Sequence, residues 1–552
     1  MARNGAPMRA IHNELRLKPV GVAMGFYHCM SAATWDYGPG VVIDWQDSRG
    51  DINYENLPKV TLSALREIGK EESAIPVPEQ RRYTGRKPVL PTALADIPCT
   101  RLGVDGLLDK LNSILGTSYT LNTHSKCFFA DTLLKTMSRR LSYSEATKSL
   151  SLHSILKSYI AQNYDFGTAY AHLRLYWYDI STARGKLYAH KKDDRNMRPN
   201  VLADGWIIRR KTPPRRVWDL YANRVVPFWA VRKHPWAVSH AWVSDEERVD
   251  VWTPINGCEW PVPIPKDSSL DLIRIEMLNL GAEYAWVDVL CLRQEHGIRD
   301  AKRAQEWQLD VPTIGYVYQW ADQVVCYFSG LGRPLNFKPG DFENDRRWFR
   351  RAWTLQEISK DPIIGGRTEG LAFVEEDLQA RFQNELASLH KMRMDDYVFD
   401  FLLQMQNRVS TNPMDKVAGL VYLFYPKFIP IYDAVQSEED AWTVLVNMMR
   451  VRPRADLLFT YPEPGNGRKC WRPSWEQAMT TTLPSHVEIE WVGKVNRLDT
   501  TNGDMYIGPY IDSGYVRGFA DECNKGKCRQ GELIIEDNTR TSHSFNIVKD
   551  HA

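Results

Sequence analysis

The sequence lacks several features that would assign a protein class at once. Its 552 residues contain no run of about 20 apolar residues, the length that a membrane helix needs. The first 21 residues also lack the apolar core of a signal peptide. Basic residues number 70 and acidic residues 68, so the net charge of +2 gives no case for binding nucleic acid or a membrane surface. We therefore expect a cytoplasmic protein without a membrane span or a nucleic-acid partner.

Motifs for a resident metal or cofactor are missing as well. The glycine-bearing stretch "SGLGRP" has neither a P-loop lysine nor the G-x-G-x-x-G order, so it predicts no phosphate site. Cys523 and Cys528 have no nearby Cys or His pair to complete a four-ligand zinc site, and a solvated loop is the better interpretation. The nine cysteines are odd in number and scattered, which fits a reducing compartment. We predict no metal and no bound cofactor.

The chain is too long for a single hydrophobic core. Residues 1–210 have no chemical motif and alternate between helical and irregular patterns. The Pro213-Pro214 pair within 207–226 suggests a hinge. We expect a mainly helical or irregular region at 1–210, an α/β domain at 215–380, and a helical, then irregular region at 381–552.

The middle region alternates between strand-like and helix-like segments. Its strand-like runs are apolar without clean alternation, as in strands covered on both faces, so a parallel sheet is predicted. Ser268 and Asp271 fit a capping box for a helix that Gly281 would end. Asn256-Gly257 predicts an inserted hairpin. The expected strands lie at 236–243, within 282–292 and at 321–329, and a helical segment at 299–321 is broken near Pro312.

Polar side chains occur where the predicted strands end. In an open parallel sheet, ligands bind beyond the carboxyl ends of the strands, and here those ends carry Ser239, Trp242 and Asp288. A hydrolase triad of Ser239, His240 and Asp288 is disfavoured, because adjacent strand residues point to opposite faces. Asp288 within an apolar stretch should find a partner or cap the strand end, with ligand contact as the second option.

The stretch "RRWFRRAWTLQEIS" at 346–359 predicts one helix. Helical spacing puts Arg350, Trp353 and Glu357 in one sector and turns Trp348, Ala352 and Leu355 toward the core. A solvated glutamate paired with Arg350 is the ordinary outcome, yet Trp353 on the same sector would expose a large apolar surface unless something covers it. A carboxylate beside an indole suits chemistry on a sugar carbon, such as cleavage of the nicotinamide–ribose bond.

Four blocks in order resemble the fungal heterokaryon incompatibility (HET) domain family across residues 215–360. They are "WAVSHAWV", "LGAEYAWVDVLCLRQ", "VPTIGYVYQWADQVVCYF" and "RRAWTLQE", and segments at 407–424 and 470–477 resemble stretches that often follow this domain. The chain departs from the family pattern at 240–243, where a glycine is replaced by Val243, and at Pro312-Thr313, where a methionine-bearing helical turn is common.

HET domains are similar to Toll/interleukin-receptor (TIR) domains, so the resemblance implies a TIR-like, flavodoxin-like parallel sheet with helical flanking regions. It implies Glu357 as the catalytic acid and NAD as a possible substrate. The residues expected to contact that substrate are Ser239, Trp242, Asp288, Arg350 and Trp353. The implied role is fungal non-self recognition leading to regulated cell death, with self-association and an unknown allorecognition partner. The alternative is a non-catalytic adaptor module that only self-associates.

Overall fold

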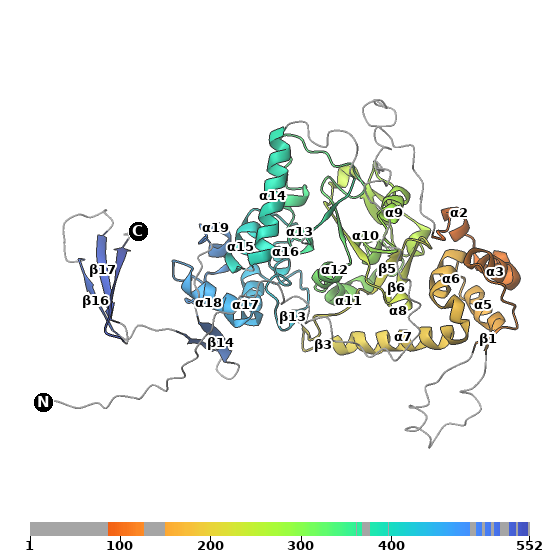
Figure 1. Ribbon diagram of the computed structural model, residues 1–552, viewed down its shortest axis with the longest axis horizontal. Coiled ribbons are helices and arrows are strands. Elements are labelled where there is room, and N and C mark those ends of the chain that lie inside the picture. The colour runs from red at the N-terminus through yellow and green to blue at the C-terminus, as the bar shows by residue number, and fades with distance from the viewer. Residues whose placement is uncertain are drawn as a thin grey trace, which may run out of the picture. The chain divides into compact units, whose positions relative to one another are not determined.

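The computed structural model describes residues 87–125, 150–359, 361–366, 376–395 and 397–485, and near the C-terminus residues 493–498, 503–508, 513–518, 529–536 and 539–549 (Figure 1). These residues form a mixed α/β structure around a six-stranded sheet. Cys523 and Cys528 lie outside the described residues. Among the helices described, none has both the length and the apolar character to cross a bilayer.

Helices precede the sheet in the chain. They are α2 (Thr92–Ala95), α3 (Cys99–Leu115), α5 (Leu152–Ala161), α6 (Phe166–Leu173) and α7 (Ile180–Val201). Gly116 adopts the left-handed conformation that ends α3. The core of these helices includes Val217 and Val226 of the sheet, so helices and sheet pack together. Short strands β1 (His124–Ser125) and β2 (Leu150–Ser151) pair with each other, as do β3 (Leu202–Ala203) and β4 (Trp206–Ile207).

The central sheet has the strand order β12-β11-β7-β10-β5-β6. β7 (Trp236–His240), β10 (Tyr284–Trp286), β11 (Val324–Tyr327) and β12 (Ile363–Ile364) run parallel. β5 (Arg216–Asp219) and β6 (Arg224–Pro227) form an antiparallel hairpin that adds to β10. The expectation of a purely parallel sheet is therefore wrong, and so is that of a hinge throughout 207–226. The diproline only precedes β5, and β-branched residues then form the hairpin.

The connections between the parallel strands follow the sequence pattern closely. An inserted antiparallel pair, β8 (Arg248–Val251) and β9 (Val262–Pro265), surrounds the predicted Asn256-Gly257 turn. Helix α9 (Leu270–Asn279) has Leu280 as its C-cap and is then followed by the predicted Gly281, whose φ of 103° suits glycine. Its N-cap is Ser269 without a side-chain bond, so the predicted capping box is wrong. α10 (Asp288–Cys291) follows β10, and α11 (Ala301–Asp310) and α12 (Ile314–Trp320) are separated near Pro312 as expected.

Residues 346–359 do not form one helix. A 3-10 turn at Trp348–Arg350 and the short helix α13 (Thr354–Glu357) are separated by extended Arg351, which pairs in parallel with Val409. The Val409 amide donates to the Arg350 carbonyl at 2.6 Å, and the Ala352 amide donates to the Val409 carbonyl at 3.0 Å. This pairing replaces helical hydrogen bonds. The predicted burial of Trp348, Ala352 and Leu355 is nevertheless confirmed.

Helices that follow in the chain share the core of the sheet. They are α14 (Glu376–Asp395), α15 (Val398–Gln406), α16 (Met414–Ala418), α17 (Glu438–Met448), α18 (Val451–Phe459) and α19 (Trp475–Thr480). Short strand β13 (Ile429–Pro430) pairs with β4. The described residues near the C-terminus form strands β14 (Lys494–Leu498), β15 (Gly503–Ile507), β16 (Gly514–Arg517), β17 (Arg529–Glu536) and β18 (Ser542–Lys549).

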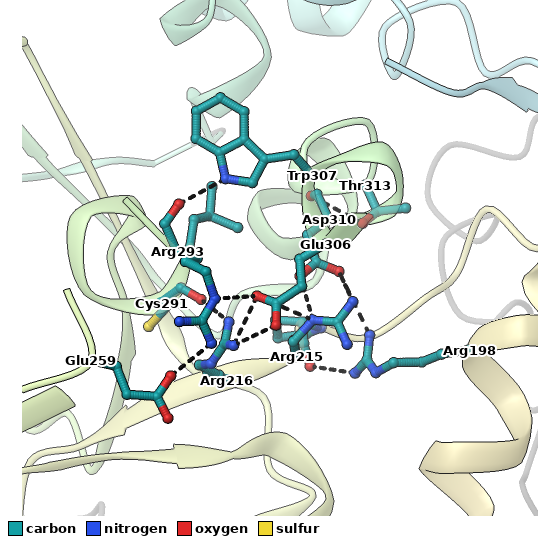
Figure 2. Close-up of polar contacts among 12 residues, drawn as sticks. Arg198, Arg215, Arg216, Glu259, Cys291, Arg293, Glu306, Trp307, Asp310 and Thr313 are labelled. Carbon is teal, nitrogen blue, oxygen red and sulfur yellow. Dashed lines mark hydrogen bonds and ion pairs between the residues drawn. The ribbon is translucent and has the colours of Figure 1, made fainter. Parts of the chain in front are cut away.

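An ion-pair network joins α7, β5, α11 and the loop after α10 (Figure 2). Arg215 binds Asp310 at 2.7 Å, and Arg216 binds Glu306 at 2.8 Å. Arg293 binds Glu259 at 2.7 Å. The guanidinium groups of Arg216 and Arg293 also lie 5.1 and 5.0 Å from the ring centroid of Trp260, which is buried. With the 3.8 Å ion pair between Arg198 of α7 and Asp310, the network connects α7 and α11 to β5.

We predict that Gly315→Ala destabilises the fold by roughly 1–3 kcal/mol, the usual cost of overpacking. A Cβ atom at Gly315 in α12 would come within 2.4 Å of the Tyr422 ring. The matched control is Gly185→Ala in α7, where a Cβ atom meets nothing within 4 Å. That change should be neutral or slightly stabilising, because alanine favours helix. Chemical unfolding measures both, and equal stability of the two variants would contradict the packing of α12 on Tyr422.

Candidate functional site

Polar residues from three segments meet at the carboxyl ends of the parallel strands. Ser239 lies near the end of β7, in register with Cys326 of β11. Asp288 begins α10, directly after β10, and Glu357 ends α13. Because the carboxyl ends of parallel strands share one edge of the sheet, residues far apart in the sequence come together there. Asp288 belongs to a run that is strand-like in sequence, but strand β10 ends two residues before it.

The Ser239 hydroxyl connects the sheet to Glu357. Ser239 is fully buried, and its Oγ donates a hydrogen bond to Oε2 of Glu357 at 2.6 Å. The same Oγ accepts a hydrogen bond from Nε1 of Trp348 at 2.7 Å. A serine hydroxyl has one proton, and the indole N–H can only donate, so the direction of both bonds is fixed. The Glu357 carboxyl is thereby oriented through a chain from indole to hydroxyl to carboxylate.

The Glu357 carboxyl titrates near neutrality. The residue as a whole is half-buried, and burial of its carboxyl group raises its pKa from 4.5 to about 7. The hydrogen bond from Ser239 opposes this rise, the negative charge of Asp288 adds to it, and His240 and Tyr318 oppose it. No basic side chain among the described residues forms an ion pair with Glu357. A carboxyl group with such a pKa populates both protonation states at physiological pH, as a general acid or base requires.

His240 and Asp288 form a second, adjacent pair. Nε2 of His240 lies 2.7 Å from Oδ1 of Asp288, and Trp242 donates its indole N–H to Oδ2 at 2.9 Å. The Val289 amide donates to Oδ1 at 2.7 Å. Burial alone would lower the pKa of His240, but the charge and hydrogen bond of Asp288 outweigh it and raise that pKa. Burial would raise the pKa of Asp288, yet His240 and the other donors hold it below its usual value.

Two residues predicted for this site have partners outside it. Arg350 pairs with Asp345 at 3.1 Å and donates to the Asn407 carbonyl. Trp353 packs against Tyr432, with ring centroids 6.3 Å apart. Extended Arg351 separates Arg350 from the helical stretch of Glu357, whereas Trp353 still lies one helical turn before Glu357. Of the predicted site residues, the structure thus brings together Ser239, Trp242, Asp288 and Glu357, and Arg350 is not among them.

Three residues near Glu357 were missed from the sequence. Tyr318 of α12 donates its hydroxyl proton to the Val238 carbonyl at 3.0 Å, and this hydroxyl also lies close enough to the Glu357 carboxyl to lower its pKa. Arg408 is buried and donates to the Arg351 carbonyl at 2.7 Å. Trp348 was assigned only a core position. Tyr318 lies in the third quoted block and Arg408 in the 407–424 segment, so the resemblance contained both without indicating a role.

Residues 236–343 match the family model of the heterokaryon incompatibility protein (HET). This part of the chain is therefore similar to HET domains. The match supports involvement in heterokaryon incompatibility. It includes Ser239, Trp242 and Asp288 and ends before Glu357. No curated protein and no solved structure gives a significant match.

We predict that Glu357→Gln stabilises the protein at pH 8 by roughly 1–3 kcal/mol and has little effect at pH 5. The pKa of Glu357 is higher in the folded protein than its ordinary 4.5, so folding favours the protonated form. Wild type therefore loses stability as pH rises from about 4.5 to about 7, and the neutral glutamine does not. Thermal unfolding at both pH values measures the difference.

The matched control for this experiment is Glu246→Gln on the exposed turn before β8. It should change stability equally at pH 5 and pH 8. If Glu357→Gln also gave equal changes at the two pH values, the raised pKa would be wrong.

Proposed function

We propose that this HET-domain protein acts in fungal non-self recognition and regulated cell death by hydrolysing NAD at the nicotinamide–ribose bond, with Glu357 as the catalytic residue. The observation that carries the proposal is the oriented carboxyl group of Glu357, with a pKa of about 7, at the carboxyl ends of the parallel strands. Ser239, Trp242 and Asp288 would lie beside the substrate at the same edge.

The chemistry suits an ionised carboxylate. The bond between ribose C1′ and the pyridinium nitrogen breaks, and its electron pair leaves with the nitrogen, so neutral nicotinamide departs without needing a proton. The carboxylate stabilises the oxocarbenium-like C1′ and takes a proton from the attacking water. The products are nicotinamide, ADP-ribose and one proton. Glu357 must therefore be ionised, and Ser239 favours that form by donating to it.

The order of the parallel strands supports a relation to TIR domains. Numbered along the chain, β7, β10, β11 and β12 are the first to fourth parallel strands, and their order in the sheet is 2-1-3-4. Flavodoxin-like sheets have the order 2-1-3-4-5 and bind ligands where the first and third strands adjoin. Ser239 and Cys326 occupy that place here. The appended β5–β6 hairpin is a departure from a purely parallel sheet.

The alternative is a module that self-associates and recruits a partner without catalysis. Measuring whether the protein turns over NAD distinguishes the enzyme from the non-catalytic module.

We expect purified full-length protein to release nicotinamide from NAD and Glu357→Gln to reduce the rate at least about 100-fold. Chromatography quantifies the nicotinamide. Glu246→Gln is the control and should keep the wild-type rate, while light scattering verifies that all three proteins assemble alike. Assembled wild type that releases no nicotinamide would overturn the enzymatic proposal and favour the adaptor module.

We also expect kcat/KM to rise with pH to a plateau, with a midpoint near pH 7, because the reaction needs ionised Glu357. Ser239→Ala removes a hydrogen bond that lowers this pKa, so its midpoint should shift upward by about one pH unit. Ser329→Ala is the matched control, because this buried serine at the end of β11 bonds the Asn336 carbonyl instead. An unchanged midpoint in Ser239→Ala would contradict the role of its hydroxyl.

A further inference from the structure

A cavity of about 870 Å³ lies between the N-terminal helices and the HET domain. One part of its lining comes from α5, α6, α7 and nearby loops of the N-terminal helices. Another part comes from Arg216 of β5, from β6, from Trp229 of α8 (Phe228–Val231) and from residues 254–260 of the HET domain. Its volume is in the range of pockets that bind small molecules. Glu357, Ser239 and Asp288 do not line it, so it is separate from the candidate functional site.

Aromatic rings surround a neutral histidine in this cavity. His172 of α6 lies 5.8 Å from Tyr159, 6.0 Å from Tyr164 and 6.0 Å from Trp229, measured between ring centroids. It is only 7% exposed, and its Nε2 has no hydrogen-bond partner among the residues that the structure describes. Burial lowers its pKa to about 4, so the ring is neutral at physiological pH and offers one donor and one acceptor.

One basic side chain that lines the cavity forms no ion pair with a described acidic residue. Arg216 is held by Glu306 at 2.8 Å, as Figure 2 shows, and Arg224 binds Asp96 and Asp165. Lys191 of α7 makes no ion pair with a described residue. Its exposed ammonium group lies 5.7 Å from the ring centroid of Trp229, beside the aromatic wall. An anionic group of a ligand could therefore bind at Lys191 while a flat ring contacts the aromatic side chains.

We propose that this cavity binds a nucleoside monophosphate. Stacking of a base on aromatic side chains is typically worth about 1–3 kcal/mol and tolerates different bases. The His172 ring is placed to select a heterocycle with hydrogen-bonding edges, and Lys191 supplies a point charge for the phosphate. Since the lining comes from both the N-terminal helices and the HET domain, a bound nucleotide contacts both parts. This site is independent of NAD cleavage at Glu357.

Calorimetric titration of the full-length Glu357→Gln protein with adenosine 5′-monophosphate tests the proposal, with adenosine and inorganic phosphate as separate probes. We expect the nucleotide to bind at least tenfold more tightly than adenosine. Lys191→Glu should weaken nucleotide binding at least tenfold and leave adenosine binding unchanged. His172→Phe keeps an aromatic ring but loses both ring nitrogens, so it should weaken binding of the nucleotide and of adenosine.

Matched controls are Lys192→Glu and His153→Phe, whose wild-type side chains do not line the cavity. Both should bind the nucleotide as the parent protein does. The proposal is overturned if adenosine, guanosine, cytidine and uridine monophosphates all fail to bind. It is also overturned if binding is unaffected by both Lys191→Glu and His172→Phe, or if inorganic phosphate binds as tightly as the nucleotide.

Discussion

The hydroxyl of Ser239 is the single contact on which the candidate site depends. It lies on the central parallel strand, accepts the indole N–H of Trp348 and gives its only proton to Glu357. The sheet thereby fixes a carboxyl group that belongs to a segment more than a hundred residues further along the chain. Because this buried hydroxyl accepts one hydrogen bond and donates another, each bond polarises and strengthens the other. Geometry and proton affinity of Glu357 are thus set by the same group.

Two neighbouring carboxyl groups at this edge have opposite properties. Asp288 accepts bonds from an imidazole, an indole and a backbone amide, and its pKa is held low. Glu357 is buried with fewer compensating donors, and its pKa is raised. Such divergence of adjacent acids is the physical basis for assigning them different roles. Asp288 serves to hold His240 and Trp242, whereas Glu357 keeps a proton that it can exchange at neutral pH.

Local signals in the sequence predicted much of the architecture. Gly281, apolar strand runs and helical periodicity identified elements whose geometry depends on near neighbours. Predictions failed where distant chain segments compete with local preference. Val409 pairs with Arg351 and breaks the expected helix, which separates Arg350 from Glu357. The β5–β6 hairpin was not predicted either, because it pairs with β10, a strand more than sixty residues further along the chain.

The backbone pairing between Arg351 and Val409 also bears on how this chain can be divided. The family match stops at residue 343, before Glu357. The segment that carries Glu357 is held in place by backbone pairing with Val409 and by hydrogen bonds from buried Arg408. A recombinant fragment that ends at residue 343 would contain Ser239 but not Glu357. A fragment that ends near residue 380 would contain both residues but would lack Arg408 and Val409. The smallest unit that can hold the intact site therefore extends into the helices beyond residue 397.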